Sequence, residues 1–105
     1  MKLLQDKVVL VTGASRGIGR AIATHLATHG AHIAFTYLSS VEKGEALSAE
    51  LQALGVKAKG YRSDASDFQA AESLVTDVVQ DFGQLDVLIN NAGVTKDTLL
   101  MRMTE

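Results

Sequence analysis

The chain has 105 residues, of which 47% are apolar and 21% are charged, and its formal net charge is −2. This length allows one domain with one modest core, and the composition is that of an ordinary globular protein. Basic and acidic residues are interspersed and form no basic stripe, which argues against a nucleic-acid partner. The absence of cysteine excludes a disulfide framework and a thiolate metal site.

The amino-terminal region contains no apolar stretch long enough for a signal peptide or a membrane span. The run that begins at Met1 is interrupted by the polar residues 5–7, and the next run, Val8–Val11, has only four residues. We therefore predict a cytoplasmic protein with no membrane partner.

The first predicted elements are a strand, a helix and a second strand. Val8–Val11 is continuously apolar, as expected for a strand buried on both faces. Small and apolar residues then recur at helical spacing over residues 18–29, which predicts a helix. Residues 31–37 are predicted to form the second strand.

The next helix is expected to begin near Ser39, where Ser39 and Glu42 have the spacing of a capping box. Its inner face is predicted to contain Leu47, Leu51 and Leu54. Residues 56–61 alternate small or apolar residues with polar ones, which favours a strand at the edge of the sheet.

A second capping box, Ser66 with Gln69, precedes the segment with the strongest helical period. The residues expected on the inner face of this helix are Phe68, Ala71, Leu74, Val75, Val78, Val79 and Phe82. Residues 85–89 are again apolar and are predicted to form the fourth strand.

Gly30, Gly55 and Gly83 each stand where a helix ends and the next strand begins. Glycine adopts the left-handed conformation of such helix ends at little cost. The repeated order of strand, helix, glycine and strand predicts parallel strands joined by crossover helices. We expect an α/β protein with a doubly wound parallel sheet (Rossmann-like), strand order 3-2-1-4, formed by residues 1–105 as half of a dinucleotide-binding domain.

A glycine-rich loop follows the first strand and opens the first helix. Its glycines, Gly13, Gly17 and Gly19, have the spacing Gly-x3-Gly-x-Gly. Backbone N–H groups at a helix N-terminus attract a pyrophosphate, and glycines allow its close approach. The alternative interpretation is a tight strand-to-helix turn without a ligand.

Together with two further motifs, this spacing resembles the short-chain dehydrogenase/reductase family. The motif Asn90-Asn91-Ala92-Gly93 follows the fourth strand, and Asp64-Ala65 follows the third. Residues at the carboxyl ends of parallel strands meet in one crevice. The resemblance implies cofactor binding by Gly13, Ala14, Ser15, Arg16, Gly17, Ile18, Gly19, Ser39, Asp64, Ala65, Asn91, Ala92 and Gly93.

Within that family the whole chain is similar to the amino-terminal half of the bacterial 3-oxoacyl-[acyl-carrier-protein] reductases of fatty-acid synthesis. Residues 99–103, Leu-Leu-Met-Arg-Met, favour this branch, although they are equally compatible with a hydrophobic segment that packs on the domain. The resemblance implies hydride transfer to a β-keto thioester carried by acyl carrier protein in the full-length enzyme.

NADP(H) is favoured over NAD(H) as the cofactor. Enzymes of this architecture that use NAD have an acidic residue after the second strand, which binds the ribose 2′-hydroxyl. Here no acid lies between the second strand and Glu42, and Arg16 could pair with a 2′-phosphate, assisted by the hydroxyls of Ser39 and Ser40. The alternative for Arg16 is a solvated turn residue.

In this family the general acid is the tyrosine of a Tyr-x3-Lys pair. Tyr37 is followed four residues later by Val41, and Tyr61 by Ala65, so neither forms such a pair. We expect a chain that holds part of the cofactor, has no catalytic residue and is inactive alone. The alternative is a free-standing half-Rossmann binding or structural module, natural or engineered.

Three further features concern metals, basic residues and assembly. His25, His29 and His32 have a spacing that can bind a metal, but no nearby acid completes a shell, and we predict no metal site. The basic cluster Lys57, Lys59 and Arg62 is expected to be a solvated strand edge and not a ligand site. A homo-oligomer is expected through an exposed fourth strand and the C-terminal segment.

Overall fold

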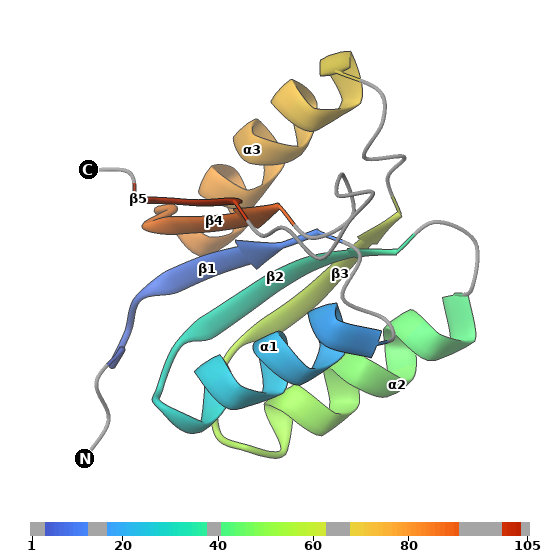
Figure 1. Cartoon of the computed structure of the whole chain (residues 1–105), viewed down its shortest axis with the longest axis vertical. Helices are drawn as coiled ribbons and strands as arrows, with labels where there is room; N and C mark the ends of the chain where they lie inside the picture. The colour runs from blue at the N-terminus through green and yellow to red at the C-terminus, as the bar shows by residue number, and fades with distance from the viewer. Residues whose placement is uncertain (1–3, 13–16, 38–40, 63–67, 91–99, 104–105) are drawn as a thin grey trace.

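The computed structural model describes residues 4–12, 17–37, 41–62, 68–90 and 100–103. Strands and helices alternate along most of the chain (Figure 1). The elements are β1 (Val8–Val11), α1 (Gly17–Thr28), β2 (His32–Tyr37), α2 (Val41–Gln52), β3 (Ala58–Arg62), α3 (Phe68–Phe82), β4 (Val87–Asn90) and β5 (Leu100–Met103).

The strands form one sheet with the order β3-β2-β1-β4-β5. The first four strands are parallel, and β1 lies at the centre, where Leu10 is in register with Ala34 of β2 and Leu88 of β4. The predicted parallel sheet with order 3-2-1-4 and the edge position of β3 are therefore confirmed.

The prediction of an open edge on β4 is wrong, because β5 pairs antiparallel with it. Leu88 is in register with Arg102, and Asn90 with Leu100. An antiparallel neighbour needs only a short connection, whereas a parallel neighbour needs a crossover of a dozen or more residues. The C-terminal segment, which was expected to be exposed, thus forms β5 and supplies the backbone partners that β4 would otherwise lack.

The two faces of the sheet have cores of different size. Helices α1 and α2 cover one face, and α3 covers the other (Figure 1). The larger core lies under α1 and α2 and includes Val9, Val11, Ala23, Ala27, Ile33, Phe35, Leu47 and Leu51. The smaller core lies under α3 and consists of Val8, Leu10, Ala34, Leu74 and Val78, with half-buried residues packed around it.

The helical patterns identified the inner faces only in part. Leu47 and Leu51 of α2 are buried as predicted, but Leu54 is exposed because α2 ends at Gln52. Leu74 and Val78 of α3 are buried. In the same helix Val75 and Val79 are 36% and 43% exposed, so the predicted inner face is too wide.

Candidate dinucleotide-binding site

The carboxyl ends of β1 and β4 lie side by side. Val11 is in register with Ile89, and the N–H of Thr12 donates to the carbonyl of Ile89 at 3.0 Å. The buried Thr12 hydroxyl also approaches this carbonyl, at 3.5 Å. These contacts hold together the two strand ends that the glycine-rich loop and the Asn-Asn-Ala-Gly motif follow in the sequence.

Helix α1 begins immediately after the loop, at Gly17, whose φ of 65° is in the left-handed region. A side chain at this position would be strained by the backbone conformation even though no atom obstructs it. The first turn of α1 contains no acidic residue. The partial positive charge of this helix end is therefore not compensated by a neighbouring carboxylate of the turn, which suits an anion.

The crossover helices lie on different faces of the sheet on the two sides of β1. The connection from β1 to β2 runs through α1 on one face, and the connection from β3 to β4 runs through α3 on the other (Figure 1). In open α/β sheets such a switch point, between β1 and β4, forms the crevice that binds a ligand.

Most of the predicted cofactor residues lie outside the described residues. Of the predicted set, the structure describes Gly17, Ile18 and Gly19. Gly19 is buried, and Ile18 is 56% exposed in the first turn. The predicted residues outside the description are Gly13, Ala14, Ser15, Arg16, Ser39, Asp64, Ala65, Asn91, Ala92 and Gly93.

The carboxyl end of β2 is where the acid of NAD-binding proteins is expected. Strand β2 ends at Tyr37, and Glu42 lies within the first turn of α2, which begins at Val41. Glu42 therefore belongs to the helix, as the sequence interpretation assumed, and not to the end of β2.

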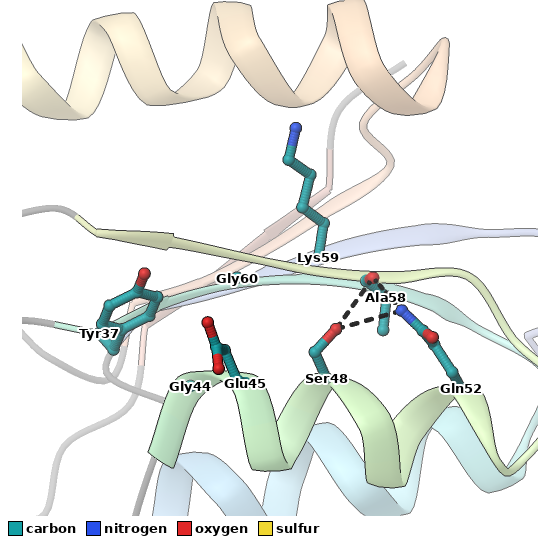
Figure 2. A pocket seen from close by; sticks show the side chains of 8 residues that line it. All are labelled: Tyr37, Gly44, Glu45, Ser48, Gln52, Ala58, Lys59 and Gly60. Carbon is teal, nitrogen blue, oxygen red and sulfur yellow. Dashed lines mark hydrogen bonds between the residues drawn. The ribbon is translucent and has the colours of Figure 1, made fainter. Parts of the chain in front are cut away.

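A cleft of about 340 Å³ lies elsewhere, between α2 and the outer strand β3 (Figure 2). The Ala58 carbonyl accepts hydrogen bonds from Ser48 Oγ at 3.3 Å and Gln52 Nε2 at 3.1 Å. These bonds occupy an outward-facing carbonyl of the edge strand, so they reduce its capacity to pair with another strand. The cleft is separate from the β1–β4 crevice. Its lining residues are Tyr37, Gly44, Glu45, Ser48, Gln52, Ala58, Lys59 and Gly60.

The predicted basic cluster on β3 is engaged by the end of α3. Asp81 Oδ2 accepts from Lys59 Nζ at 2.8 Å and from the Tyr61 hydroxyl at 2.6 Å. Lys57 Nζ donates to the Asp81 carbonyl at 2.7 Å and lies over the Phe82 ring. Lys57 and Lys59 thus fasten α3 to the sheet edge.

This network alters two pKa values. The hydrogen bonds from Lys59 and Tyr61 lower the pKa of the Asp81 carboxyl. Partial burial, followed by the hydrogen bond to Asp81, raises the pKa of the Tyr61 phenol well above its ordinary value. Tyr61 therefore remains protonated and is a poor proton donor at neutral pH.

Sequence reasoning did not anticipate the structural role of Thr12. The sequence interpretation assigns no role to Thr12, whereas the structure shows that this residue joins the ends of β1 and β4. The detectable signal is a polar residue that directly extends a fully apolar strand.

The fold and the crevice define the class of α/β proteins that bind nucleotides at a sheet switch point. The family described as short chain dehydrogenase matches residues 7–105. The chain therefore belongs to the short-chain dehydrogenase family.

Two curated relatives illustrate the range of similar enzymes. The chain is 50% identical over 99 residues to the 3-oxoacyl-[acyl-carrier-protein] reductase FabG of Staphylococcus aureus, which covers 94% of this chain and 40% of that protein. It is 47% identical over 94 residues to the L-rhamnose 1-dehydrogenase (NAD(P)(+)) of a Sphingomonas species, which covers 90% of this chain and 37% of that protein.

A solved structure agrees with the fold. A short-chain dehydrogenase from Burkholderia cenocepacia in complex with NADP is 47% identical, with a TM-score of 0.83 over 89% of this chain and 38% of that chain. The chain thus spans about 40% of the length of these relatives. Among the residues that the structure describes, no helix is long and apolar enough to cross a membrane.

Proposed function

We propose that this chain is the NADP(H)-binding portion of a 3-oxoacyl-[acyl-carrier-protein] reductase. The observation that carries the proposal is the β1–β4 switch point, where Thr12 joins the two strand ends and α1 begins at a left-handed glycine. The pyrophosphate of the cofactor would bind backbone N–H groups at this helix end, and the exposed Ile18 would contact the bound nucleotide.

The preference for NADP(H) rests on charge. An acid at the end of β2 would repel a 2′-phosphate, and the sequence has none between Tyr37 and Val41. Arg16 would pair with the 2′-phosphate, assisted by Ser39, while Asp64 and Ala65 would hold the adenine. The relative from Burkholderia, solved with NADP, supports this choice.

The nicotinamide end would be held in part by the motif Asn91-Ala92-Gly93. When bound, the cofactor supplies the hydride for reduction of a β-keto thioester on acyl carrier protein. This chain contributes nucleotide binding and orientation only, because neither Tyr37 nor Tyr61 is part of a Tyr-x3-Lys pair. A second candidate, a binding module without catalysis, is favoured by that same observation.

Location and assembly remain part of the proposal. We expect a cytoplasmic protein that self-associates, and Val75 and Val79 on α3 provide exposed apolar surface for such contact. Sedimentation at micromolar concentration measures this directly, and a strictly monomeric chain would contradict it.

A chimera tests the proposed function. This chain would replace the matched segment of the S. aureus reductase, and the hybrid would be assayed with an acetoacetyl thioester. We expect turnover with NADPH in preference to NADH, while the 105-residue chain alone gives none. A folded chimera without activity favours the binding module, and turnover by the purified chain alone contradicts our account of its missing catalytic residues.

A further inference from the structure

Two histidine rings lie together at the end of α1 that is remote from the glycine-rich loop. His25 is in the last turn of the helix, and His29 follows one turn later, just beyond Thr28. Their ring centroids are 4.9 Å apart, and their planes meet at 71°. The loop precedes Gly17 at the opposite end of the helix, so this pair is separate from the nucleotide crevice.

The separation of the rings suits a shared metal ion. At a metal–nitrogen length of about 2.1 Å, two imidazoles bound to one ion have ring centres roughly 4.5–5.2 Å apart, depending on the angle between the bonds. The observed 4.9 Å falls within this interval. The separation of the rings is therefore compatible with one nitrogen of each ring binding the same ion after the side chains reorient.

The two rings are also available, because neither is committed to another partner among the described residues. His25 is exposed. In His29 the buried nitrogen without a partner is Nδ1, which leaves Nε2 as the atom that an ion can reach. The unpartnered Nδ1 of His29 already destabilises the fold, and binding of an ion by Nε2 would not add to that cost.

His32, the third histidine of the sequence pattern, has a different role. Its Nδ1 accepts the backbone N–H of Lys57 at 2.9 Å, and its Nε2 lies 3.4 Å from an Asp6 carboxylate oxygen. These contacts join the start of β2 to β3 and to the segment before β1. His32 is thus held in place as a structural residue, and the site consists of a pair and not a trio.

We propose, in contrast to the expectation from the sequence, that His25 and His29 form a two-histidine site for a divalent transition-metal ion such as Zn²⁺ or Ni²⁺. Imidazole suits both ions, and water would complete the coordination. Within the described part of the chain, no group of three or more His, Cys, Asp or Glu residues could hold a metal. The site is therefore weaker than a four-ligand structural zinc site, and its ion would fasten the last turn of α1 to the turn before β2.

Titration of the chain with Zn²⁺ alone and with Ni²⁺ alone tests this site, with calorimetry for stoichiometry and the histidine ring signals in NMR for location. We expect one ion per chain, with shifts confined to His25 and His29, and full reversal by a chelator. Because the ion binds the folded form, a concentration of ten times its Kd should raise the folding equilibrium constant about tenfold.

The variants H25A and H29A should each abolish saturable binding, whereas H32Q should retain it. If H29A does not fold, H25A decides the outcome, because His25 is exposed and its removal disturbs no core contact. Binding that survives H25A, or that shifts the His32 signals instead, would overturn the proposal.

Discussion

The two ends of the parallel sheet differ in the helix termini that they present and in the contacts that the described residues make there. At the amino end, Val8 N–H donates to Asp86 Oδ2 at 2.8 Å, and Asp86 N–H donates back to the Val8 carbonyl. Leu4 N–H reaches the His29 carbonyl there, and Lys7 accepts from His32 N–H. Helices α1, α2 and α3 end at this side, so their carbonyl termini are directed to it.

The carboxyl end presents the opposite helix termini. Helices α1, α2 and α3 all begin there, with N–H groups that no preceding turn can satisfy (Figure 1). At this side the N–H and the hydroxyl of Thr12 both donate to the Ile89 carbonyl and so join the ends of β1 and β4. We propose a division of roles, in which the amino end stabilises the fold and the carboxyl end binds the nucleotide. Substitutions at the two ends should therefore affect different measurements.

The largest expected effect is on cofactor binding. In the chimera described above, R16A should weaken NADPH binding by about 1.5–3 kcal/mol, typical of a charge-assisted hydrogen bond. This corresponds to roughly tenfold to a hundredfold in Kd, with NADH binding nearly unchanged. The matched control is R20A, because Arg20 lies in α1 and pairs with Glu50 of α2 instead. Equal losses for both cofactors would show that Arg16 supports the loop and not the phosphate.

A comparable effect on stability is expected at the amino end. D86A should destabilise the chain by about 1–3 kcal/mol, because the part-buried Val8 N–H loses its acceptor. D86N keeps a carbonyl oxygen in this place and should cost clearly less. Urea unfolding measures both, and neither variant should alter the ratio of NADPH to NADH affinity. A change in that ratio would contradict the division between the two ends.

The fold is largely readable from the sequence because its signals are local. The fully apolar run Val8–Val11 and the left-handed glycines Gly30 and Gly55 are features of neighbouring residues, and the structure has them as predicted. The pairing of β5 with β4 depends on residues that are distant in sequence, and no local pattern specifies it. Similarly, the period of α3 predicts a helix but not its neighbours, which is why the exposure of Val79 was missed.

The candidate site was predicted from motif spacing, and the structure adds the framework that supports it. The meeting of the β1 and β4 ends follows from strand order, which the repeated crossovers predict. The polar residue after Val8–Val11 is visible in the sequence, but its partner Ile89 is not, because the contact depends on register between strands separated by most of the chain.

A smaller loss of stability is expected at Gly55, which follows the end of α2 at the amino end of the sheet. Gly55 has a φ of 90°, and no atom obstructs a side chain there, so backbone strain alone opposes substitution. G55A should cost about 1–2 kcal/mol, the usual penalty for a left-handed L-residue. G55N should cost less, because asparagine tolerates this conformation. Thermal unfolding of the two variants decides this, and equal stability of G55A and the parent chain would refute the strain.

The smallest effect concerns pH and the Asp81 network. Because the pKa of Asp81 is lowered in the folded state, its contribution is present above the ordinary aspartate value of about 3.9 and is lost as pH falls through the folded value. The raised pKa of Tyr61 has the opposite consequence, with stability that decreases as pH rises above about 10.

D81N should therefore flatten the acid limb of the stability profile and reduce the alkaline decrease. The matched control is D77N in the same helix, since Asp77 forms neither of these hydrogen bonds and acts on Tyr61 only through its charge, the smallest of the causes. Denaturant midpoints between pH 2 and 11 would reveal the difference. Identical profiles for D81N and the parent chain would show that this network does not couple protonation to folding.

We propose above that the nucleotide binds at the carboxyl ends of β1 and β4. Amide chemical-shift mapping with NADP⁺ on the 105-residue chain tests it most directly, because weak binding is detectable and each end of the sheet has its own signals. We predict saturable shifts at Thr12, Gly17 and Ile18, with Asp86 and His32 unaffected. An absence of saturable shifts, or shifts confined to the amino end or to the α2–β3 cleft, would contradict the account.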